Sequence, residues 1–176
     1  NSFLYCNLLL SIKRNNMSLK IGDSAPSFTL KNQNTEDISL NNFAGKNVLL
    51  LFFPFANTSV CTEEMCSMRD NMNQYAVLNA EIIGISVDSP FALKMWEEKH
   101  NINFHLLSDF NKEVSLLYNV LDEVFAPAKF AYKGVSKRAA FIIDTDGKII
   151  YREICEHPGL QPDYEAIKSK LNSLKS

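Results

Sequence analysis

Two cysteines five positions apart, Cys61 and Cys66, have the residue type and spacing best suited to chemistry in this sequence. A thiolate is a strong nucleophile, and two thiols in one segment can exchange electrons by forming and breaking a disulfide. Cys61 lies in the first turn of an expected helix, with Thr58 or Ser59 as the N-cap. The unpaired N–H groups and the positive dipole end of that turn favour a thiolate. Cys61 is therefore the candidate nucleophile.

A cation is also needed, because Glu63 and Glu64 are expected in the same first turn and carboxylates oppose ionisation of a nearby thiol. Arg138 is the candidate, since it directly precedes the apolar strand pattern Ala139–Ile143 and a residue at a strand end can point into a site at that edge. Its guanidinium stays charged and offers paired N–H donors to a bound oxygen or a departing hydroxide. The sequence thus predicts that Arg138 stabilises the thiolate of Cys61.

The two cysteines cannot bond while this helix is intact. At 3.6 residues per turn, Cys66 lies roughly 140° around the helix from Cys61, and five residues give an axial rise of ~7.5 Å. A disulfide needs the two Cα atoms to be within ~7 Å of each other. A redox couple of these cysteines therefore requires the first turns to unwind in each cycle. The stripe on the Cys61 side of the helix is apolar and is expected to be core: Met65, Met68, Met72 and Tyr75.

The elements that position these residues alternate between strand and helix patterns from Leu19 to Leu174, which predicts a single α/β domain. The last two strands are expected to form an antiparallel pair, because Asp146-Gly147 between them is a strong hairpin signal. The expected strands are Ser27–Leu30, Asp37–Leu40, Val48–Phe53, Glu81–Val87, His105–Leu107, Ala139–Asp144 and Lys148–Glu153.

Four helices are expected among these strands. They cover about Ser59–Asn79, a segment that begins at Asp88-Ser89-Pro90, Asn111–Tyr118, and a segment from Pro162-Asp163 to near Leu174. The unbroken apolar runs Val48–Phe53 and Ile82–Val87 indicate central strands that are covered on both faces. The predicted architecture is a parallel central sheet with an antiparallel pair at one edge and helices on both faces.

Composition and charge exclude several classes of function. The 176 residues carry a net charge of −2, so the sequence has no basic footprint for nucleic acid or for an anionic membrane. The longest apolar run, Asn47–Phe55, is far shorter than the ~20 residues of a membrane-spanning helix. There is no C-x2-C pair and the three histidines have no ligand-like spacing, so we expect neither a metal nor another cofactor.

Residues 1–16 are interpreted as a leader, and residues 17–176 as the domain. The apolar segment Phe3–Leu10 is followed by Lys13 and Arg14, and Met17 comes after them. A secretory signal has its charges before the apolar stretch, so this order argues against secretion. The leader is either non-native or unprocessed, or alternatively targets an organelle. Four irregularly spaced cysteines favour a reducing compartment, the cytoplasm.

The active-site segment resembles that of a known family. Pro54, Thr58 and Cys61 match the P-x-x-x-T-x-x-C motif of peroxiredoxins, and the spacing from Cys61 to Cys66 is similar to that of the PrxQ, or bacterioferritin comigratory protein, subgroup. The resemblance covers most of Leu19–Leu174 and includes Ile21–Leu30, Gly84–Pro90, Leu107–Asp109 and Lys137–Asp144.

This resemblance implies a thioredoxin-like fold with the N-terminal additions of peroxiredoxins. It implies that Cys61 is the peroxidatic cysteine, that the hydroxyl of Thr58 shares a hydrogen bond with the thiolate and orients the peroxide, and that Pro54 shields the sulfur from water. Arg138 matches the active-site arginine of the family, and Glu64 matches a glutamate often found three residues after the peroxidatic cysteine.

The same resemblance implies how the oxidised enzyme is restored. Cys61 would become a sulfenic acid, Cys66 at the resolving position would convert it to a disulfide, and thioredoxin or a similar dithiol protein would reduce that disulfide. Hydrogen peroxide and organic hydroperoxides are the implied substrates. The sequence leaves open whether the protein is a monomer or a homodimer.

The sequence departs from the family pattern at two positions, and three alternative functions remain open. Asn57 replaces the phenylalanine that is common before the motif threonine, and Cys155 is expected to be structural. A one-cysteine peroxiredoxin with an external thiol is one alternative, and a redox-sensing or holdase-like protein is another. A thiol–disulfide oxidoreductase would need C-x-x-C, whereas position 64 is Glu.

Overall fold

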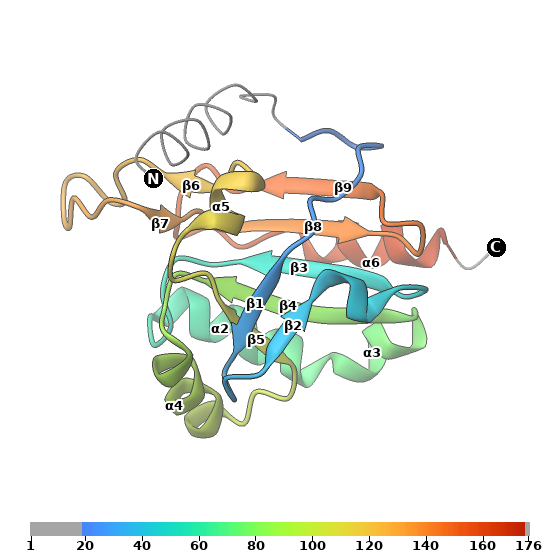
Figure 1. Ribbon diagram of the computed structural model, residues 1–176, viewed down its shortest axis with the longest axis horizontal. Coiled ribbons are helices and arrows are strands. Elements are labelled where there is room, and N and C mark those ends of the chain that lie inside the picture. The colour runs from blue at the N-terminus through green and yellow to red at the C-terminus, as the bar shows by residue number, and fades with distance from the viewer. Residues whose placement is uncertain (1–18, 175–176) are drawn as a thin grey trace, which may run out of the picture.

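A computed structural model describes residues 19–174, whose backbone is organised around a seven-stranded mixed sheet (Figure 1). The strand order across this sheet is β2-β1-β5-β4-β3-β8-β9. The strands are β1 (Thr29–Asn32), β2 (Asp37–Ser39), β3 (Asn47–Phe52), β4 (Ala80–Ser86), β5 (His105–Ser108), β8 (Ala139–Ile143) and β9 (Ile149–Ile154). The interpretation of residues 1–16 as a leader lies outside the described residues.

The centre of the sheet is parallel, as the sequence predicted. β4 pairs in parallel with β3 on one side and with β5 on the other. All six residues of β3 are buried, as expected for an apolar strand covered on both faces. β8 and β9 form the predicted antiparallel pair at one edge, and Gly147 in their turn has a φ of 76°, which glycine adopts without strain. The other edge is also antiparallel, because β1 pairs in that sense with both β2 and β5.

Side-chain caps start two of the α-helices. The helices are α2 (Ser59–Asp70), α3 (Met72–Val77), α4 (Pro90–His100), α5 (Glu113–Leu117) and α6 (Tyr164–Asn172), with a short 3-10 helix η1 (Leu40–Phe43). The hydroxyl of Ser89 accepts a hydrogen bond from the N–H of Ala92 at the start of α4, and the carboxylate of Asp163 accepts one from Ala166 at the start of α6. Both helices begin where the sequence predicted them.

The single helix predicted over 59–79 is two helices. Asn71 breaks it, with a φ of −104° and a ψ of 8°. Its side-chain amide donates to the carbonyl of Ser67, a local bond that competes with regular helix formation. The 12 residues of α2 therefore form an element separate from α3.

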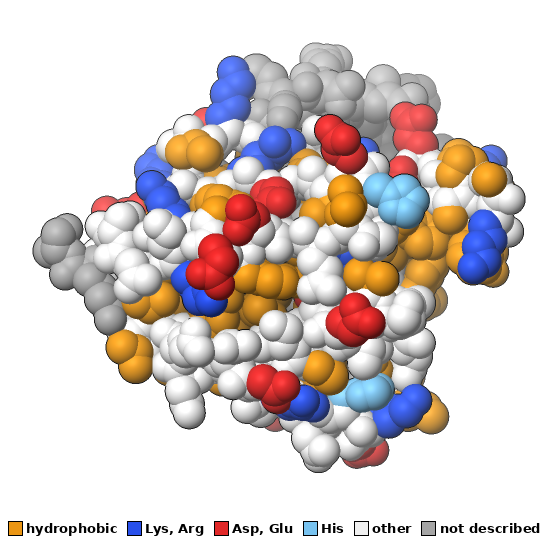
Figure 2. All heavy atoms as spheres, turned by 180° about the vertical axis from the view of Figure 1, so that it is seen from behind, with side chains coloured by type: hydrophobic (Ala, Val, Ile, Leu, Met, Phe, Trp, Pro, Cys, Tyr) orange, Lys and Arg blue, Asp and Glu red, His pale blue; other side chains and the backbone are white. Residues whose placement is uncertain are grey.

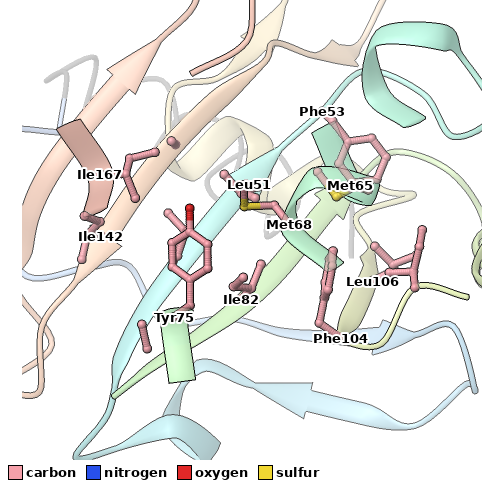
Figure 3. Packing of buried hydrophobic residues seen from close by; sticks show 14 of the residues in the cluster. Leu51, Phe53, Met65, Met68, Tyr75, Ile82, Phe104, Leu106, Ile142 and Ile167 are labelled. Atoms are coloured by element: carbon pink, nitrogen blue, oxygen red, sulfur yellow. The ribbon is translucent and has the colours of Figure 1, made fainter. Parts of the chain in front are cut away.

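Apolar side chains of α2, α3, α4 and α6 pack on one face of the sheet, and those of α5 pack on the other. In the stripe predicted as core, Met65, Met68 and Tyr75 are at most 1% exposed (Figure 3), and Met72 is partly buried against them. Gly84 of β4 lies under this stripe, and an added Cβ would be 2.9 Å from a side-chain carbon of Leu106. The packing fixes α2 against the sheet and so fixes the position of Cys61.

A small two-stranded unit lies apart from the main sheet and was not predicted. It pairs β6 (Leu121–Asp122) with β7 (Val135–Ser136), and the loop between them projects from the molecule (Figure 1). Hydrophobic side chains gather on this projection, at the right of Figure 2. Across residues 19–174, no helix has the length and apolar composition needed to cross a bilayer.

Candidate active site

Cys61 lies in the first turn of α2, where the sequence predicted it. Thr58 is the N-cap residue and has an extended backbone conformation, with a φ of −91° and a ψ of 155°. Its side chain makes no capping bond, so the N–H groups of the first turn remain available to a negative charge. The Cys61 side chain faces the sheet and is 1% exposed.

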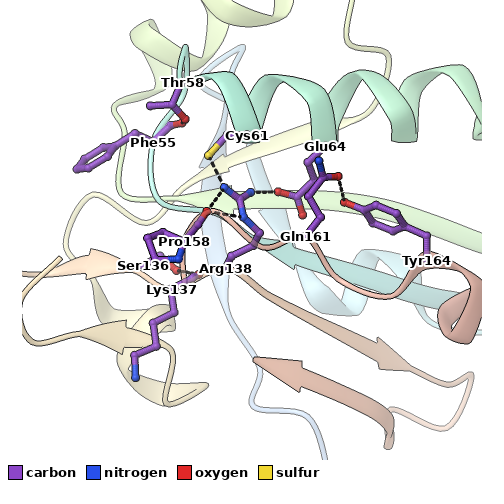
Figure 4. A network of polar contacts seen from close by, with 10 residues as sticks. All are labelled: Phe55, Thr58, Cys61, Glu64, Ser136, Lys137, Arg138, Pro158, Gln161 and Tyr164. Carbon is purple, nitrogen blue, oxygen red and sulfur yellow. Dashed lines mark hydrogen bonds and ion pairs between the residues drawn. The ribbon is translucent and has the colours of Figure 1, made fainter. Parts of the chain in front are cut away.

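Arg138 connects Cys61 to Glu64 (Figure 4). It directly precedes β8, its Nη2 donates a hydrogen bond to Cys61 Sγ at 3.1 Å, and its Nη1 is paired with a carboxylate oxygen of Glu64. Its Nε and Nη2 also donate to the carbonyl oxygen of Pro158, at 3.2 and 3.0 Å. Arg138 is 2% exposed. The structure thus brings together Cys61, Arg138 and Glu64, with the guanidinium held between the thiol and the carboxylate.

Burial and ion pairing shift the pKa values of Glu64 and Arg138 in opposite directions. Burial raises the pKa of Glu64 to about 7, and the charge and hydrogen bonds of Arg138 counteract that rise. Burial lowers the pKa of Arg138, but Glu64 and Cys61 together outweigh it, so the pKa of Arg138 is raised overall. The guanidinium therefore stays positively charged beside the sulfur.

The prediction that Glu63 and Glu64 lie in the first turn is wrong. α2 begins at Ser59, so its first turn contains no acidic residue and both glutamates fall in the second turn. Glu63 is exposed, whereas Glu64 is 0% exposed and turned toward Arg138. Glu64 thus holds the cation in place.

The motif residues before the helix form the wall of the site. Pro54 is buried and lines the same cavity as Cys61. The Thr58 hydroxyl donates to the carbonyl of Phe55 at 3.0 Å, so its hydrogen bond in this structure goes to the backbone and not to the sulfur. Asn57 has a φ of 60°, a left-handed conformation that asparagine adopts more readily than phenylalanine.

The other two described cysteines lie outside this triad. Cys66 is half-buried on α2, five residues after Cys61 within one unbroken helix, and the two thiols are not bonded. Cys155 follows β9 and is also half-buried, and its N–H donates to the carbonyl of Arg138. Burial raises the pKa of Cys155 to about 11, with Glu153 and Glu64 contributing to the rise, so this thiol stays protonated at neutral pH.

An apolar cavity of about 680 Å³ opens over Cys61 and Arg138. Its outer wall is the projecting loop between β6 and β7, whose aromatic rings stack on one another and pack edge-to-face against Phe55. The aromatic residues are Phe55, Phe125, Phe130 and Tyr132. The cavity therefore joins solvent to a buried thiol through an aromatic passage.

Two parts of the site were missed by sequence reasoning. The Pro158 carbonyl fixes Arg138, and a backbone oxygen in a loop leaves no signal in the sequence. The aromatic wall had a signal, since Phe125, Phe130 and Tyr132 stand close together in a stretch without strand or helix periodicity. Among residues 19–174, no group of three or more His, Cys, Asp or Glu side chains is arranged to hold a metal ion.

Comparison with known proteins places this geometry in a family. The model of the AhpC/TSA family matches residues 21–152. This chain is a peroxiredoxin of the AhpC/TSA family. Peroxiredoxins are thiol peroxidases, and a buried thiol beside an arginine at the start of a helix is consistent with that chemistry.

Relatives of this peroxiredoxin include peroxiredoxin Bcp of Escherichia coli K12, which is 41% identical over 131 residues, 74% of this chain and 83% of that protein. A putative peroxiredoxin bcp of Haemophilus influenzae is 39% identical over 156 residues, 89% of this chain and 98% of that protein. The crystal structure of peroxidoxin BcpB from Mycobacterium tuberculosis has a TM-score of 0.78 at 27% identity, covering 90% of this chain and 99% of that one. The fold is thus the thioredoxin-like fold of these peroxiredoxins, as the sequence predicted.

Proposed function

We propose that this peroxiredoxin reduces hydroperoxides through Cys61 and uses Cys66 as its resolving cysteine. The observation that carries the first part is the hydrogen bond from Arg138 Nη2 to Cys61 Sγ, at the floor of a cavity that reaches solvent. A fixed positive charge and the first-turn N–H groups both favour the thiolate, and the thiolate is the form that attacks oxygen.

In the first step, the Cys61 thiolate attacks the terminal oxygen of the hydroperoxide. A sulfur–oxygen bond forms, the oxygen–oxygen bond breaks, and the departing hydroxide or alkoxide takes up a proton. As the sulfur bonds to oxygen, the Nη2 donor of Arg138 is released from Cys61 and can hold the departing oxygen while its charge develops. Thr58 can take part only if its hydroxyl turns from the Phe55 carbonyl toward the substrate, and Pro54 excludes water from the sulfur.

In the second step, the Cys66 thiolate attacks the sulfur of the Cys61 sulfenic acid. A disulfide forms and hydroxide leaves, which a proton converts to water. Since both cysteines belong to the 12-residue helix α2, its first turns must unwind for the sulfurs to meet. A dithiol protein of the thioredoxin kind then reduces the disulfide and is itself oxidised. The proposed setting is the cytoplasm, where such a reductant is kept reduced.

The cavity supports organic hydroperoxides as substrates in addition to hydrogen peroxide. Four aromatic rings line its outer part, so a substrate with an apolar group can bury that group there while its peroxide reaches Cys61. Hydrogen peroxide has no such group and would gain nothing from these rings.

A coupled assay tests this function. The protein is mixed with excess hydrogen peroxide, thioredoxin, thioredoxin reductase and NADPH, and NADPH consumption is followed. We expect steady turnover in the native protein and none in Cys61→Ser, while Cys155→Ser retains it. Stoichiometric oxidation without turnover would support a redox sensor instead.

A further inference from the structure

The loop that leads into α2 is anchored by a carboxylate from the neighbouring strand. This loop, residues 53–58, is called the active-site loop below. Asp88 lies just after β4, and its Oδ2 accepts a hydrogen bond at 2.8 Å from the backbone N–H of Ala56 in the loop. Because β3 and β4 are parallel, the segments that follow them leave the same edge of the sheet. A group outside α2 thus fixes the chain that enters it.

Asp88 is itself held at its carboxylate and at its backbone carbonyl. The hydroxyl of Ser86, which is fully buried in β4, donates to the same Oδ2 at 2.8 Å. The hydroxyl of Ser108, the last residue of β5, donates to the carbonyl oxygen of Asp88 at 2.6 Å. Ser86 and Ser108 are paired in register, so both bonds come from the centre of the sheet. The position of the carboxylate is therefore set by the sheet and not by the loop.

The peptide group between Phe55 and Ala56 is hydrogen-bonded on both of its sides. Its N–H donates to Asp88, and its carbonyl accepts the hydroxyl of Thr58 at 3.0 Å (Figure 4). A bond to a carboxylate is a strong one, and hydrogen bonds in such a chain polarise and strengthen one another. Asp88 therefore fixes the orientation of the peptide on which the motif threonine rests.

The residue after this peptide has the backbone conformation of a hinge. Asn57 has a φ of 60°, in a region that residues other than glycine rarely occupy, and it stands between Ala56 and the N-cap Thr58. Hinges are a few residues at the ends of elements that absorb a change of φ and ψ. Rotation at Asn57 can therefore move the start of α2 while Ala56 stays bonded to Asp88.

We propose that Asp88 is a positioning residue of the peroxidase site, which holds the active-site loop as the fixed end from which α2 unwinds and refolds. This inference rests on the proposed function, in which α2 unwinds so that Cys66 can reach Cys61. Asp88 does not line the cavity over Cys61, so it acts through the loop and not on the peroxide. Its bond to Ala56 survives each cycle and returns Thr58 and Cys61 to the same place.

The first test separates the hydrogen bond of Asp88 from its charge. Oxidation of Cys61 by hydrogen peroxide is measured by stopped flow in Asp88→Ala and in Asp88→Asn. The asparagine removes the charge and keeps an acceptor oxygen, so it should retain most of the native rate, whereas Asp88→Ala should be about tenfold slower. Asp146→Ala, which removes an exposed carboxylate in the turn between β8 and β9, is the matched control. Equal losses in Asp88→Ala and Asp88→Asn, or no loss in Asp88→Ala, would overturn the proposal.

A second test does not depend on catalysis. Hydrogen exchange of the backbone amides is followed by NMR in the reduced proteins. The Ala56 amide should exchange about tenfold faster in Asp88→Ala than in the native protein, and at close to the native rate in Asp88→Asn. Native exchange at Ala56 in Asp88→Ala would show that the carboxylate does not anchor the loop.

The fixed end is tested in the native protein alone, before and after oxidation by one equivalent of hydrogen peroxide. We expect the Ala56 amide to keep its protection from exchange, while the amides of residues 62–66 lose theirs. Loss of protection at Ala56 as well would mean that the loop is released together with the helix, and the proposal would be wrong. Protection kept at residues 62–66 would instead contradict the proposed unwinding of α2, with the anchor judged by Ala56 in Asp88→Ala.

Discussion

At the scale of single residues, the site depends on one guanidinium shared between a thiol and a carboxyl. Arg138 bonds Cys61 through one terminal nitrogen and Glu64 through the other, while its Nε and Nη2 also donate to the Pro158 carbonyl. Glu64 is fully buried, so it has no water to replace Arg138 as a partner. Catalysis and stability are therefore coupled through the same side chain.

We expect Arg138→Met to slow the reaction of Cys61 with hydrogen peroxide by roughly 10²–10³-fold, because it removes donors from the developing charge. The same change should lower the free energy of unfolding by about 3–5 kcal/mol, since it leaves a buried carboxyl unpaired. Stopped-flow oxidation and urea unfolding measure the two effects. The double variant Arg138→Met/Glu64→Gln should regain part of the stability and none of the rate; a regained rate would contradict this account.

Glu64 should also make stability depend on pH. Its pKa is raised from 4.5 to about 7 in the folded state, so the folded protein holds a proton that the unfolded chain releases as the pH rises. This contribution is complete below pH 4.5 and is lost by about pH 7, and it amounts to about 3 kcal/mol at most. The free energy of unfolding, measured with urea, should therefore fall less between pH 5 and pH 7.5 for Glu64→Gln than for the native protein. Identical falls would show that Glu64 does not titrate in this range.

At the scale of elements, α2 is both the activating and the obstructing part of the site. Its first turn presents N–H groups to Cys61, and its intact helix keeps Cys66 away. The break at Asn71 confines the required rearrangement to 12 residues, so α3 can keep its packing against the sheet. This break could not be read from helix periodicity, because the apolar stripe continues through it to Tyr75.

The only tryptophan of the chain can report this unwinding. Trp96 of α4 is fully buried, and its Nε1 donates to the hydroxyl of Thr62 at 3.2 Å, next to Cys61. Disulfide formation should remove Thr62 from this position and change the tryptophan fluorescence. One equivalent of peroxide should produce this change in the native protein and not in Cys66→Ser, although both oxidise Cys61. An equal change in both proteins would mean that oxidation alone, without unwinding, alters the surroundings of Trp96.

At the scale of the whole molecule, the site is assembled from segments far apart in the sequence. The nucleophile comes from α2, its cation from the start of β8, and the wall of its cavity from the loop between β6 and β7. The central strands and the place of Arg138 were predictable, because buried strands are apolar without interruption and a charged residue at a strand end is conspicuous. The clustered rings of the aromatic wall stand out in the sequence, but their place over Cys61 was not predictable, because the flanking strands have only two residues each and the wall depends on tertiary packing with Phe55.

This wall should affect only substrates with an apolar group. We expect Phe130→Ala to raise the KM for cumene hydroperoxide about five- to tenfold, in line with the loss of an aromatic contact of about 1–1.5 kcal/mol. The kinetics with hydrogen peroxide should stay unchanged. Phe91→Ala is the matched control, because Phe91 is 72% exposed on α4 and does not line this cavity. Equal losses for both peroxides would argue against a substrate-binding role for the loop.

The central claim, that Cys61 and Cys66 form a redox couple by unwinding α2, is tested most directly by locating the disulfide. The reduced protein is oxidised with one equivalent of hydrogen peroxide, free thiols are blocked, and a non-reducing proteolytic digest is mapped by mass spectrometry. This account expects a Cys61–Cys66 disulfide within one chain. A bond from Cys61 to Cys155, or to a cysteine of a second chain, would contradict it.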